Sequence, residues 1–570
     1  MTQLLEPHAG VRPRTSPSTA SPEPARRSRS TLTVFVTACV AYLVAGWQLA
    51  IEHHAIVLDA MARAANASYV ISSRDPHLAA VGFVWNPLPS FAALPFLALS
   101  PWFPELRTQA FASNVVSAIF MAGSVAVIWQ ILRELRIATA AMIALTALYA
   151  IHPIILEYGA NGDSEATLVF FLALTCLGLM RWLERRDLNS LLLIGTALAF
   201  GYLSRQELLA AGGASLALIL AVTYLDARGS AKHRRWTAAT EAAIAGMPFV
   251  LAIVCWAGSA WMIVGTALSY LDANALQVNS AQSSIASVVG GPNALDRFGY
   301  FLGELLLLEP LWSIIVVAAL VMSWRRRDPR VLAPLVTFGA VAGAQAVLFG
   351  AGSTFGWMRF AITVVPLTIV CSGLLLNTRP ESSARASART PRRAGSVFTA
   401  TLMAVAIVAA LVAIPSAVGG MTTERFGREE AASVHLLPGY GWAPTGASYI
   451  RPHAFDGYAD IARYFDRQHL RDGSVLTDDT STFPLILASK KPRQFIIPSD
   501  YDFERSVADP AAFKVKYLLL SNGQTDALRS SYPIAGVGRK AHISVGTFVR
   551  SFDGGPFQLY LFRVTHSITG

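Results

Sequence analysis

The stretch F-A-S-N-V-V-S-A-I-F-M-A-G-S-V-A-V-I-W-Q-I-L-R-E-L-R, residues 111–136, decides the fold class of this chain. Most of it belongs to an apolar run at 108–131, and a helix of about 20 apolar residues is long enough to cross a bilayer. The run is followed by the basic cluster R-E-L-R at 133–136. Basic residues directly after an apolar run are typical of the cytoplasmic end of a transmembrane helix.

Ten further apolar runs of spanning length occur in the chain. They lie at 31–51, 137–153, 164–183, 189–204, 207–225, 240–265, 301–322, 331–350, 358–376 and 396–416. With a cytoplasmic N-terminus, about eleven spans place every basic cluster on the cytoplasmic side, as the positive-inside rule requires. These clusters occupy 133–136, 181–186, 226–235, 325–330 and 379–393. The sequence therefore predicts a polytopic α-helical protein that crosses the cell membrane many times.

The composition agrees with a membrane protein and argues against a protein that binds nucleic acid. Of the 570 residues, 53% are hydrophobic and 14% are charged, whereas soluble domains carry about 25% charged residues. The net charge is +10, but the basic residues gather in the short clusters between apolar runs. A positive-inside bias accounts for that placement, so we expect the lipid bilayer as a partner and no nucleic acid.

The segments between and beside the spans divide the chain into expected domains. Residues 1–30 are rich in Pro, Ser, Thr and Arg, which predicts a disordered cytoplasmic N-terminus. The transmembrane domain is expected at 31–416, with a first outer loop at 52–107 and a second at 153–164. Within the first loop, 85–104 is apolar but contains five prolines, which are costly inside a helix. We therefore expect this segment to be re-entrant or interfacial.

An odd number of spans leaves residues 417–570 outside the cytoplasm. Helical periodicity occurs at 456–469. Runs typical of strands occur at 474–478, 494–498, 516–521 and 557–564. This alternation predicts a C-terminal extracytoplasmic α/β domain.

Acidic residues near the outer ends of the spans are candidates for chemistry, because charges at membrane depth are costly and usually functional. Asp59 follows the first span among apolar neighbours, and partial burial there would raise its pKa and its basicity. The alternative for Asp59 is an ordinary surface charge on a loop helix. Asp163 and Glu165 precede and begin another span. A helix N-terminus favours nearby acids, but that explains one acid better than several.

Arginine residues at two other outer turns suggest phosphate binding. Arg205 and Glu207 lie in a short outer turn, and Arg359 lies at the outer end of a late span. A guanidinium group matches the oxygens of a phosphate, although Arg205 and Glu207 can also simply pair with each other. Trp85 and Tyr158 either offer faces for stacking on a sugar or belong to the aromatic belt at the membrane interface.

Several short motifs resemble prokaryotic members of the GT-C class of membrane glycosyltransferases, related to the protein O-mannosyltransferases and the aminoarabinose transferases. The motifs are Asp59-Ala60, Asp75-Pro76-His77, G-F-V-W-N-P-L-P at 82–89, His152-Pro153 followed by Glu165, Arg205-Gln206-Glu207 and Arg359-Phe360. The resemblance covers roughly residues 30–375. Two features depart from the family pattern: A-R-A-A-N-A-S at 62–68 replaces an arginine-rich stretch, and His152 replaces an asparagine. These departures concern the sugar and the acceptor.

The resemblance implies an inverting glycosyltransferase that moves a sugar from a polyprenyl-phosphate donor to an acceptor outside the cytoplasm. The sugar is expected to be of the mannose or arabinose type, and the acceptor an envelope glycan, lipid or protein. No cofactor is expected to be required, although carboxylates and a phosphate can share a divalent metal.

The same resemblance implies a role for each candidate residue. Asp59 would be the general base, and Asp163 or Glu165 would assist it or orient the acceptor. Arg205 and Arg359 would hold the donor phosphate, with His54 as a secondary candidate. The remaining substrate-binding residues would be Trp85, Tyr158 and Glu207.

Two other classes of function remain open at this point. A transporter or flippase for polysaccharide or lipid would show paired repeats and polar residues at mid-membrane depth. A non-catalytic membrane scaffold that presents the C-terminal domain would tolerate the replacement of Asp59 and Glu165 without loss of function.

Overall fold

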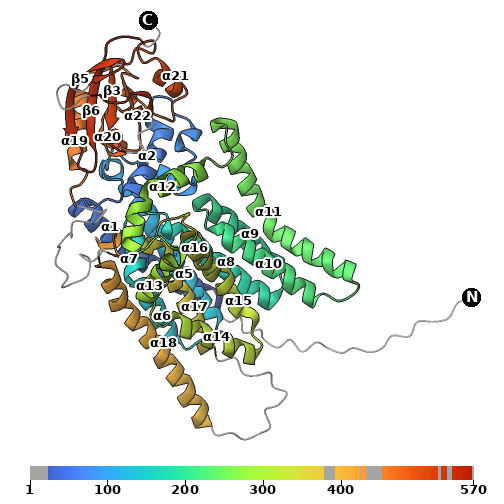
Figure 1. The fold of residues 1–570 in the computed structure, drawn as a ribbon. Coiled ribbons are helices and arrows are strands. Elements are labelled where there is room, and N and C mark those ends of the chain that lie inside the picture. Colours follow the sequence, from blue (N-terminus) through green and yellow to red (C-terminus); the bar gives the residue numbers. More distant parts are fainter. Residues whose placement is uncertain are drawn as a thin grey trace, which may run out of the picture.

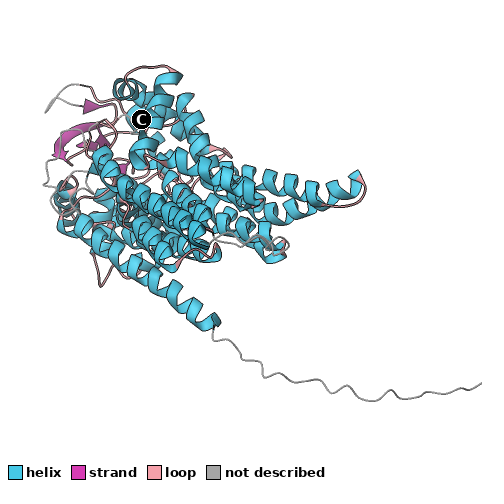
Figure 2. Cartoon of the chain, turned by 90° about the horizontal axis from the view of Figure 1, so that it is seen from below, coloured by secondary structure: helices cyan, strands magenta, loops and turns pink. Residues whose placement is uncertain are grey.

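The computed structural model describes residues 23–377, 392–423, 425–431, 452–523, 528–535 and 542–567. A bundle of helices forms most of the molecule, and a smaller unit that contains the β-sheet lies at one end of it (Figure 1). Seen from below, helices fill most of the view and the strands lie together at one side (Figure 2).

Within the described residues, eight helical stretches are long and apolar enough to cross a membrane. Five of them are α1 with η1 (Glu23–Trp47 and Gln48–Glu52), α5 (Phe111–Glu134), α8 (Glu165–Arg185), α10 (Leu208–Asp226) and α11 (Ala231–Val264). The sixth is built from η3 (Pro329–Val331), α15 (Leu332–Pro334), η4 (Leu335–Gly339) and α16 (Ala340–Gly350). The last two are η5 with α17 (Met358–Ala361 and Val364–Leu376) and α18 (Arg392–Met421).

Three more helical segments account for the other predicted runs. The pair α6 (Thr139–Ala150) and α7 (Pro153–Ala160) is bent by 57°, and the pair α13 (Ala294–Leu308) and α14 (Trp312–Arg326) by 79°. The third segment, α9 (Leu188–Ser204), has 17 residues. The described residues thus contain up to ten spans if each bent pair is one span, besides the shorter α9. The predicted class of a polytopic α-helical protein is confirmed.

The first bend lies at the end of the predicted run 137–153, and the second interrupts the predicted run 301–322. Pro153 is the first residue of α7, because proline lacks an N–H group and fits the start of a helix but not its interior. The predicted outer loop 153–164 is therefore mostly helix, and only 161–164 links α7 to α8. The second run breaks at 309–311, between α13 and α14.

The structure differs from the sequence prediction in two further segments. The helix α1 begins at Glu23, so residues 23–30 are helical and only 1–22 of the predicted disordered tail lie outside the described residues. The helix α12 (Ser269–Val289) lies between the predicted runs 240–265 and 301–322, where no helix was predicted. Its polar sequence explains why no span was predicted there.

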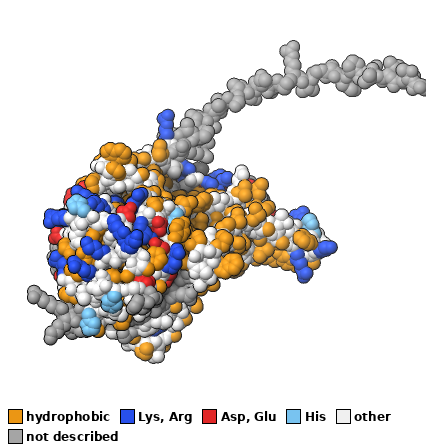
Figure 3. Space-filling view, turned by 90° about the horizontal axis from the view of Figure 1, so that it is seen from above, with side chains coloured by type: hydrophobic (Ala, Val, Ile, Leu, Met, Phe, Trp, Pro, Cys, Tyr) orange, Lys and Arg blue, Asp and Glu red, His pale blue; other side chains and the backbone are white. Residues whose placement is uncertain are grey.

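The outward faces of the spanning helices carry large apolar side chains. On α11, the exposed fractions are 57% for Leu251, 59% for Val254 and 74% for Met262. The helices that include α11 protrude from the bundle as an arm (Figure 1). Hydrophobic side chains cover the flank of this arm, whereas charged side chains gather over the sheet-containing end of the molecule and at the tip of the arm (Figure 3). A continuous apolar surface of this size suits contact with lipid and agrees with a multi-pass membrane protein.

The segment after α1 folds into short helices at the end of the bundle that faces the sheet-containing unit. These helices are α2 (Leu58–Ser72), η2 (Leu78–Val81), α3 (Leu88–Leu97) and α4 (Glu105–Thr108). The proline-rich segment 85–104 contains α3, whose ten residues extend about 15 Å at 1.5 Å per residue. That length is too short to cross a bilayer, in agreement with the expected interfacial or re-entrant segment.

The helix α2 lies between the membrane helices and the sheet-containing unit. Its residues Ala60, Ala64 and Ala65 have no exposed surface. It packs against α3 and α5 on one side and against α20 (Phe483–Ala488) on the other. Alanine side chains allow this close approach on both sides, so α2 fixes the junction of the two parts.

The C-terminal unit is a mixed sheet with strand order β2-β1-β3-β6-β5-β4 in the described residues. The strands are β1 (Val475–Thr477), β2 (Phe495–Ile496), β3 (Tyr517–Ser521), β4 (His542–Ile543), β5 (Gly546–Asp553) and β6 (Gln558–Val564). Its helices are α19 (Asp456–Arg467), α20, η7 (Pro492–Gln494), α21 (Phe503–Ala508) and α22 (Leu528–Ser531). Strand β1 pairs in parallel with β2 and β3, and β6 pairs antiparallel with β3 and β5. The four predicted strands and the predicted helix are confirmed, whereas β4 and β5 were not predicted.

Gly162, in the link between α7 and α8, provides a test of this packing. Its φ is +89°, and a Cβ at this position would lie 2.8 Å from the Cβ of Ala60 on α2. We expect Gly162→Ala to reduce the free energy of unfolding by about 1–3 kcal/mol, because both the left-handed backbone and the contact oppose it. Thermal unfolding in one detergent would measure the change.

The matched control is Gly213→Ala on α10, where an added Cβ meets no heavy atom within 4 Å. That variant should unfold at the wild-type temperature or above it, because alanine is the better helix former. Equal unfolding temperatures for the two variants would contradict the packing described for Gly162.

Candidate active site

Arg359 is the centre of a buried cluster of charged side chains. It lies in η5, directly before α17, and is 4% exposed. Its Nη1 donates hydrogen bonds to Oδ2 of Asp59 at 3.0 Å and to Oδ2 of Asp163 at 3.1 Å. The indole of Trp357 lies 4.2 Å from the guanidinium carbon and adds a cation–π interaction. Three segments that are distant in sequence therefore meet at this arginine.

A second guanidinium group, that of Arg205, extends the cluster. Arg205 lies between α9 and α10 and forms ion pairs of 2.5 Å with Glu165 and with Glu207. The same Oε1 atom of Glu165 lies 3.6 Å from Nε of Arg359, so the two arginines share this carboxylate. Arg205 and Glu207 thus pair with each other, as the simpler interpretation of the sequence allowed, and Arg205 also reaches Glu165.

A third guanidinium group, that of Arg63, belongs to the cluster but was not assigned a role from the sequence. Arg63 is 5% exposed, and its Nη2 donates to Oγ of Ser164 at 2.7 Å. Its Nε and Nη1 have no hydrogen-bond partner among the described residues. Buried polar groups are almost always hydrogen-bonded, so these two donors mark a place for a polar ligand. The available sequence signal was the spacing of four residues from Asp59, which puts both side chains on one face of α2.

Two acids that follow α18 complete the cluster. Oε2 of Glu429 lies 3.2 Å from Nε of Arg359. The hydroxyl of Tyr158 donates to Oε1 of Glu430 at 2.8 Å, and Tyr158 is only 1% exposed. Because the ring of Tyr158 is enclosed, its contact with the cluster runs through Glu430. Sequence analysis missed both glutamates, since they follow the last span in a stretch without a periodic pattern.

The acids of the cluster differ in pKa because their surroundings differ. The expected rise in the pKa of Asp59 is wrong: burial alone would raise it, but the charges of Arg359 and Arg63 outweigh burial and hold the pKa below its usual value. Burial, together with the Glu165 carboxylate, raises the pKa of Asp163 to about 7 despite the opposing effect of Arg359. Asp59 is therefore ionised at neutral pH, whereas Asp163 carries a proton for part of the time.

Accessibility separates the same acids. The exposed fraction of the side chain is 33% for Asp59, 2% for Asp163 and 1% for Glu165. A molecule that approaches from solvent can thus reach the carboxylate of Asp59 with the least rearrangement. Asp163 and Glu165 act on such a molecule mainly through their charge.

The cluster includes six of the nine residues predicted for the site. They are Asp59, Asp163, Glu165, Arg205, Glu207 and Arg359. Tyr158 joins through Glu430. Trp85 instead packs against Phe483 of α20, with 6.3 Å between the ring centroids. His54 is hydrogen-bonded to Asp456 of the C-terminal unit, so the structure does not bring it to the arginine side chains.

Arg359 also bears on the question of a divalent metal. Its guanidinium group already lies between the carboxylates of Asp59 and Asp163, which are the atoms that a shared cation would bind. The residues present therefore fit an arginine-neutralised site better than a metal-bound one.

Replacing Arg359 tests whether it holds the carboxylates together. We expect Arg359→Ala to lower the free energy of unfolding by about 3–5 kcal/mol, because buried charges lose their partner. The loss of unfolding free energy should be smaller near pH 5 than near pH 8. Without Arg359, the buried carboxyl groups have raised pKa values. They are protonated and tolerate burial below those pKa values, and they become costly charges above them. Thermal unfolding over this pH range measures both effects.

The control for this prediction is Arg359→Lys, which keeps the positive charge and should lose less stability than the alanine variant. An alanine variant that is as stable as the wild type at neutral pH would contradict the role of Arg359 as the shared partner.

Comparison with known proteins yields one family match. Residues 99–256 match the sequence profile of the family described as dolichyl-phosphate-mannose-protein mannosyltransferase. This range contains Asp163, Glu165, Arg205 and Glu207 of the cluster, while Asp59 and Arg359 lie outside it. No curated protein matches the chain in sequence.

Several solved structures of the oligosaccharyltransferase of the archaeon Archaeoglobus fulgidus are similar to the chain. The complex with an inhibitory peptide and a dolichol-phosphate has 13% identity and a TM-score of 0.43, covering 86% of this chain and 69% of that one. The complex with Zn and sulfate has 13% identity and a TM-score of 0.43, covering 85% and 67%. The form tethered to an acceptor peptide has 12% identity and a TM-score of 0.44, covering 86% and 69%. The family match over residues 99–256 confirms the resemblance that the motifs predicted, which is to membrane glycosyltransferases of the GT-C class.

Proposed function

We propose that this chain is an inverting glycosyltransferase that moves a sugar from a polyprenyl-phosphate donor to an acceptor outside the cytoplasm. The observation that carries the proposal is the partly exposed carboxylate of Asp59, which lies beside the buried guanidinium groups of Arg63 and Arg359, with the partly buried Arg205 in the same cluster. Such a site combines a base for a hydroxyl group with positive charge for a phosphate. The family match supports the same class of reaction.

Asp59 is the general base in this proposal. It takes the proton of an acceptor hydroxyl while the hydroxyl oxygen attacks the anomeric carbon of the donor sugar. The bond between that carbon and the phosphate oxygen breaks, and the polyprenyl phosphate leaves with the bonding electrons. A single displacement of this kind inverts the configuration at the anomeric carbon. The low pKa of Asp59 keeps it ionised, and its partial exposure leaves it open to the acceptor.

The donor phosphate binds to the guanidinium groups. Nε and Nη1 of Arg63 are unpaired and buried, so they gain most from a phosphate oxygen. Arg205 and Arg359 are already paired with carboxylates, and they act on the leaving group through charge. This division differs from the expectation that Arg205 and Arg359 hold the phosphate, with His54 as a secondary candidate.

The proton on Asp163 adjusts the charge of the site to an anionic donor. The cluster contains more carboxyl groups than guanidinium groups, so a bound phosphate is repelled unless some of the acids are protonated. Burial also raises the pKa of Glu429 and Glu430, which brings the balance closer to neutrality. Because Arg359 and these protons offset the negative charge of the carboxylates and the phosphate, the proposed reaction requires no divalent metal.

The proposal also fixes an orientation and a range of substrates. The distribution of basic clusters supports an N-terminus in the cytoplasm, with the cluster around Arg359 and the C-terminal unit on the opposite side. The sugar is of the mannose or arabinose type, and the acceptor is a glycan, lipid or protein of the cell envelope. The C-terminal unit packs beside α2 and therefore lies close to where an acceptor approaches Asp59.

Transfer from labelled polyprenyl-phosphate mannose and polyprenyl-phosphate arabinose to an envelope fraction tests this function. The wild-type protein should transfer one of the two sugars. Asp59→Asn should reduce the rate by about 100-fold or more, because the amide cannot accept the proton. The control is Glu52→Gln, an exposed acid of the same loop, which should retain activity. A fully active Asp59→Asn variant would show that another residue is the base, whereas a wild-type protein that transfers neither sugar would contradict the proposed reaction.

The pKa of Asp163 predicts how donor binding depends on pH. The apparent Kd for the polyprenyl-phosphate sugar, a phosphodiester whose charge is constant in this range, should rise up to about tenfold from pH 6 to pH 8, since Asp163 with a pKa of about 7 gains negative charge. Asp163→Asn stays neutral and should bind with nearly constant affinity. An unchanged pH profile in this variant would assign the titration to another group.

A further inference from the structure

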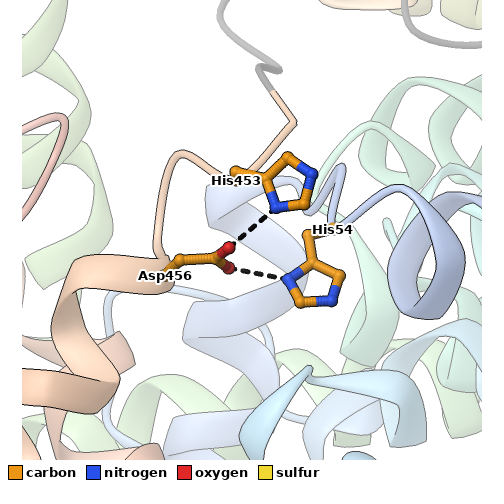
Figure 4. A group of neighbouring side chains, drawn as sticks. All are labelled: His54, His453 and Asp456. Atoms are coloured by element: carbon orange, nitrogen blue, oxygen red, sulfur yellow. Dashed lines mark hydrogen bonds and ion pairs between the residues drawn. The ribbon is translucent and has the colours of Figure 1, made fainter.

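A second group of side chains with metal-binding chemistry lies outside the arginine cluster. His54 follows η1, and His453 and Asp456 lie at the start of α19 (Figure 4). Nδ1 of His54 lies 2.7 Å from Oδ1 of Asp456, and Nδ1 of His453 lies 2.7 Å from Oδ2. One carboxylate thus receives two imidazoles that come from distant parts of the chain.

The backbone holds the two imidazoles side by side. The N–H group of His453 donates to the carbonyl oxygen of His54 at 3.2 Å, and the ring centroids are 4.8 Å apart. Both residues have positive φ, +48° for His54 and +60° for His453, a conformation that is uncommon without glycine. The arrangement therefore does not depend on the side chains alone.

The donor atoms are close enough to share one ion. The three ligand atoms, one from each residue, all lie within 4.8 Å of one another. Ligands at 2.0–2.2 Å from a tetrahedral ion are about 3.4 Å apart, so small rotations of the side chains suffice to admit it. The side chains are 31%, 62% and 46% exposed for His54, His453 and Asp456, which leaves room for that movement and for a water ligand.

We propose that His54, His453 and Asp456 bind a divalent transition metal that links the first outer loop to the C-terminal unit. Zn²⁺ is the ion with which the site can be tested. Two imidazole nitrogens and one carboxylate oxygen are ligands that suit zinc, with water in the fourth position. Calcium and magnesium prefer oxygen ligands alone, so they fit this donor set poorly.

The position of the site gives the metal a structural role. His54 lies just before α2, whose first turn contains Asp59, and Asp456 begins α19 of the C-terminal unit. A bound ion would therefore hold the segment before Asp59 against that unit. The proposal concerns binding and stability, and it holds whether or not the chain transfers sugars.

Zinc binding by the full-length protein tests the proposal. The protein, carrying an affinity tag without histidine, is stripped with a chelator and titrated with Zn²⁺ in detergent. We expect about one tightly bound zinc ion per chain by elemental analysis, and a higher unfolding temperature with zinc than without it. His54→Ala and His453→Ala should each weaken binding at least about tenfold and remove the thermal shift.

The control is His233→Ala, which replaces an exposed histidine at the start of α11 and should bind zinc as the wild type does. Unfolding temperatures without metal identify a variant that is misfolded, and Asp456→Asn then serves as the alternative variant. A wild-type protein that binds no zinc, or His54 and His453 variants that bind it unchanged, would overturn the proposal. The three residues would then form a hydrogen-bonded contact only.

Discussion

The interaction on which this structure depends is the sharing of one buried guanidinium group, that of Arg359, among several carboxylates. Asp59 comes from the helix α2, Asp163 from the turn before α8, and Glu429 from the segment after α18. Each acid alone would be costly to bury, and their mutual repulsion would push these segments apart. The positive charge of Arg359 turns this repulsion into a net attraction. The segments that carry the three acids can therefore pack together around it.

Much of the fold could be predicted from the sequence, because the physical signals are local. Apolar length and the placement of basic clusters identify spans without knowledge of their packing. The bends after Ala150 and after Leu308 were missed, since a hydropathy pattern reports the length of an apolar stretch but not its direction. The strand β5 was missed for a related reason: only two of its eight residues are buried, so its alternation is weak.

The candidate site was predictable to the extent that each residue carried its own signal. Asp59, Arg205 and Arg359 stand out because charges next to apolar runs are uncommon. Arg63 carried such a signal only through its spacing from Asp59, and Glu429 carried none. Trp85 shows the opposite case, in which a clear sequence signal does not mark a site residue. Its motif is distinctive, yet its ring packs against Phe483, and its neighbour Asn86 donates a hydrogen bond to the carbonyl oxygen of Tyr202. A motif can mark a packing contact as readily as a substrate contact.

The position of α2 has a consequence for how the two halves of the molecule communicate. This helix contacts membrane helices on one side and the C-terminal unit on the other, through alanine side chains that have no exposed surface. Asp59 therefore lies on a helix that both units contact, whereas Arg359 belongs to the bundle. A rigid-body displacement of the C-terminal unit by about an ångström that carried α2 with it would alter the 3.0 Å distance between the Asp59 carboxylate and the Arg359 guanidinium group. A partner or ligand that shifts the C-terminal unit would in this way change the surroundings of the Asp59 carboxylate.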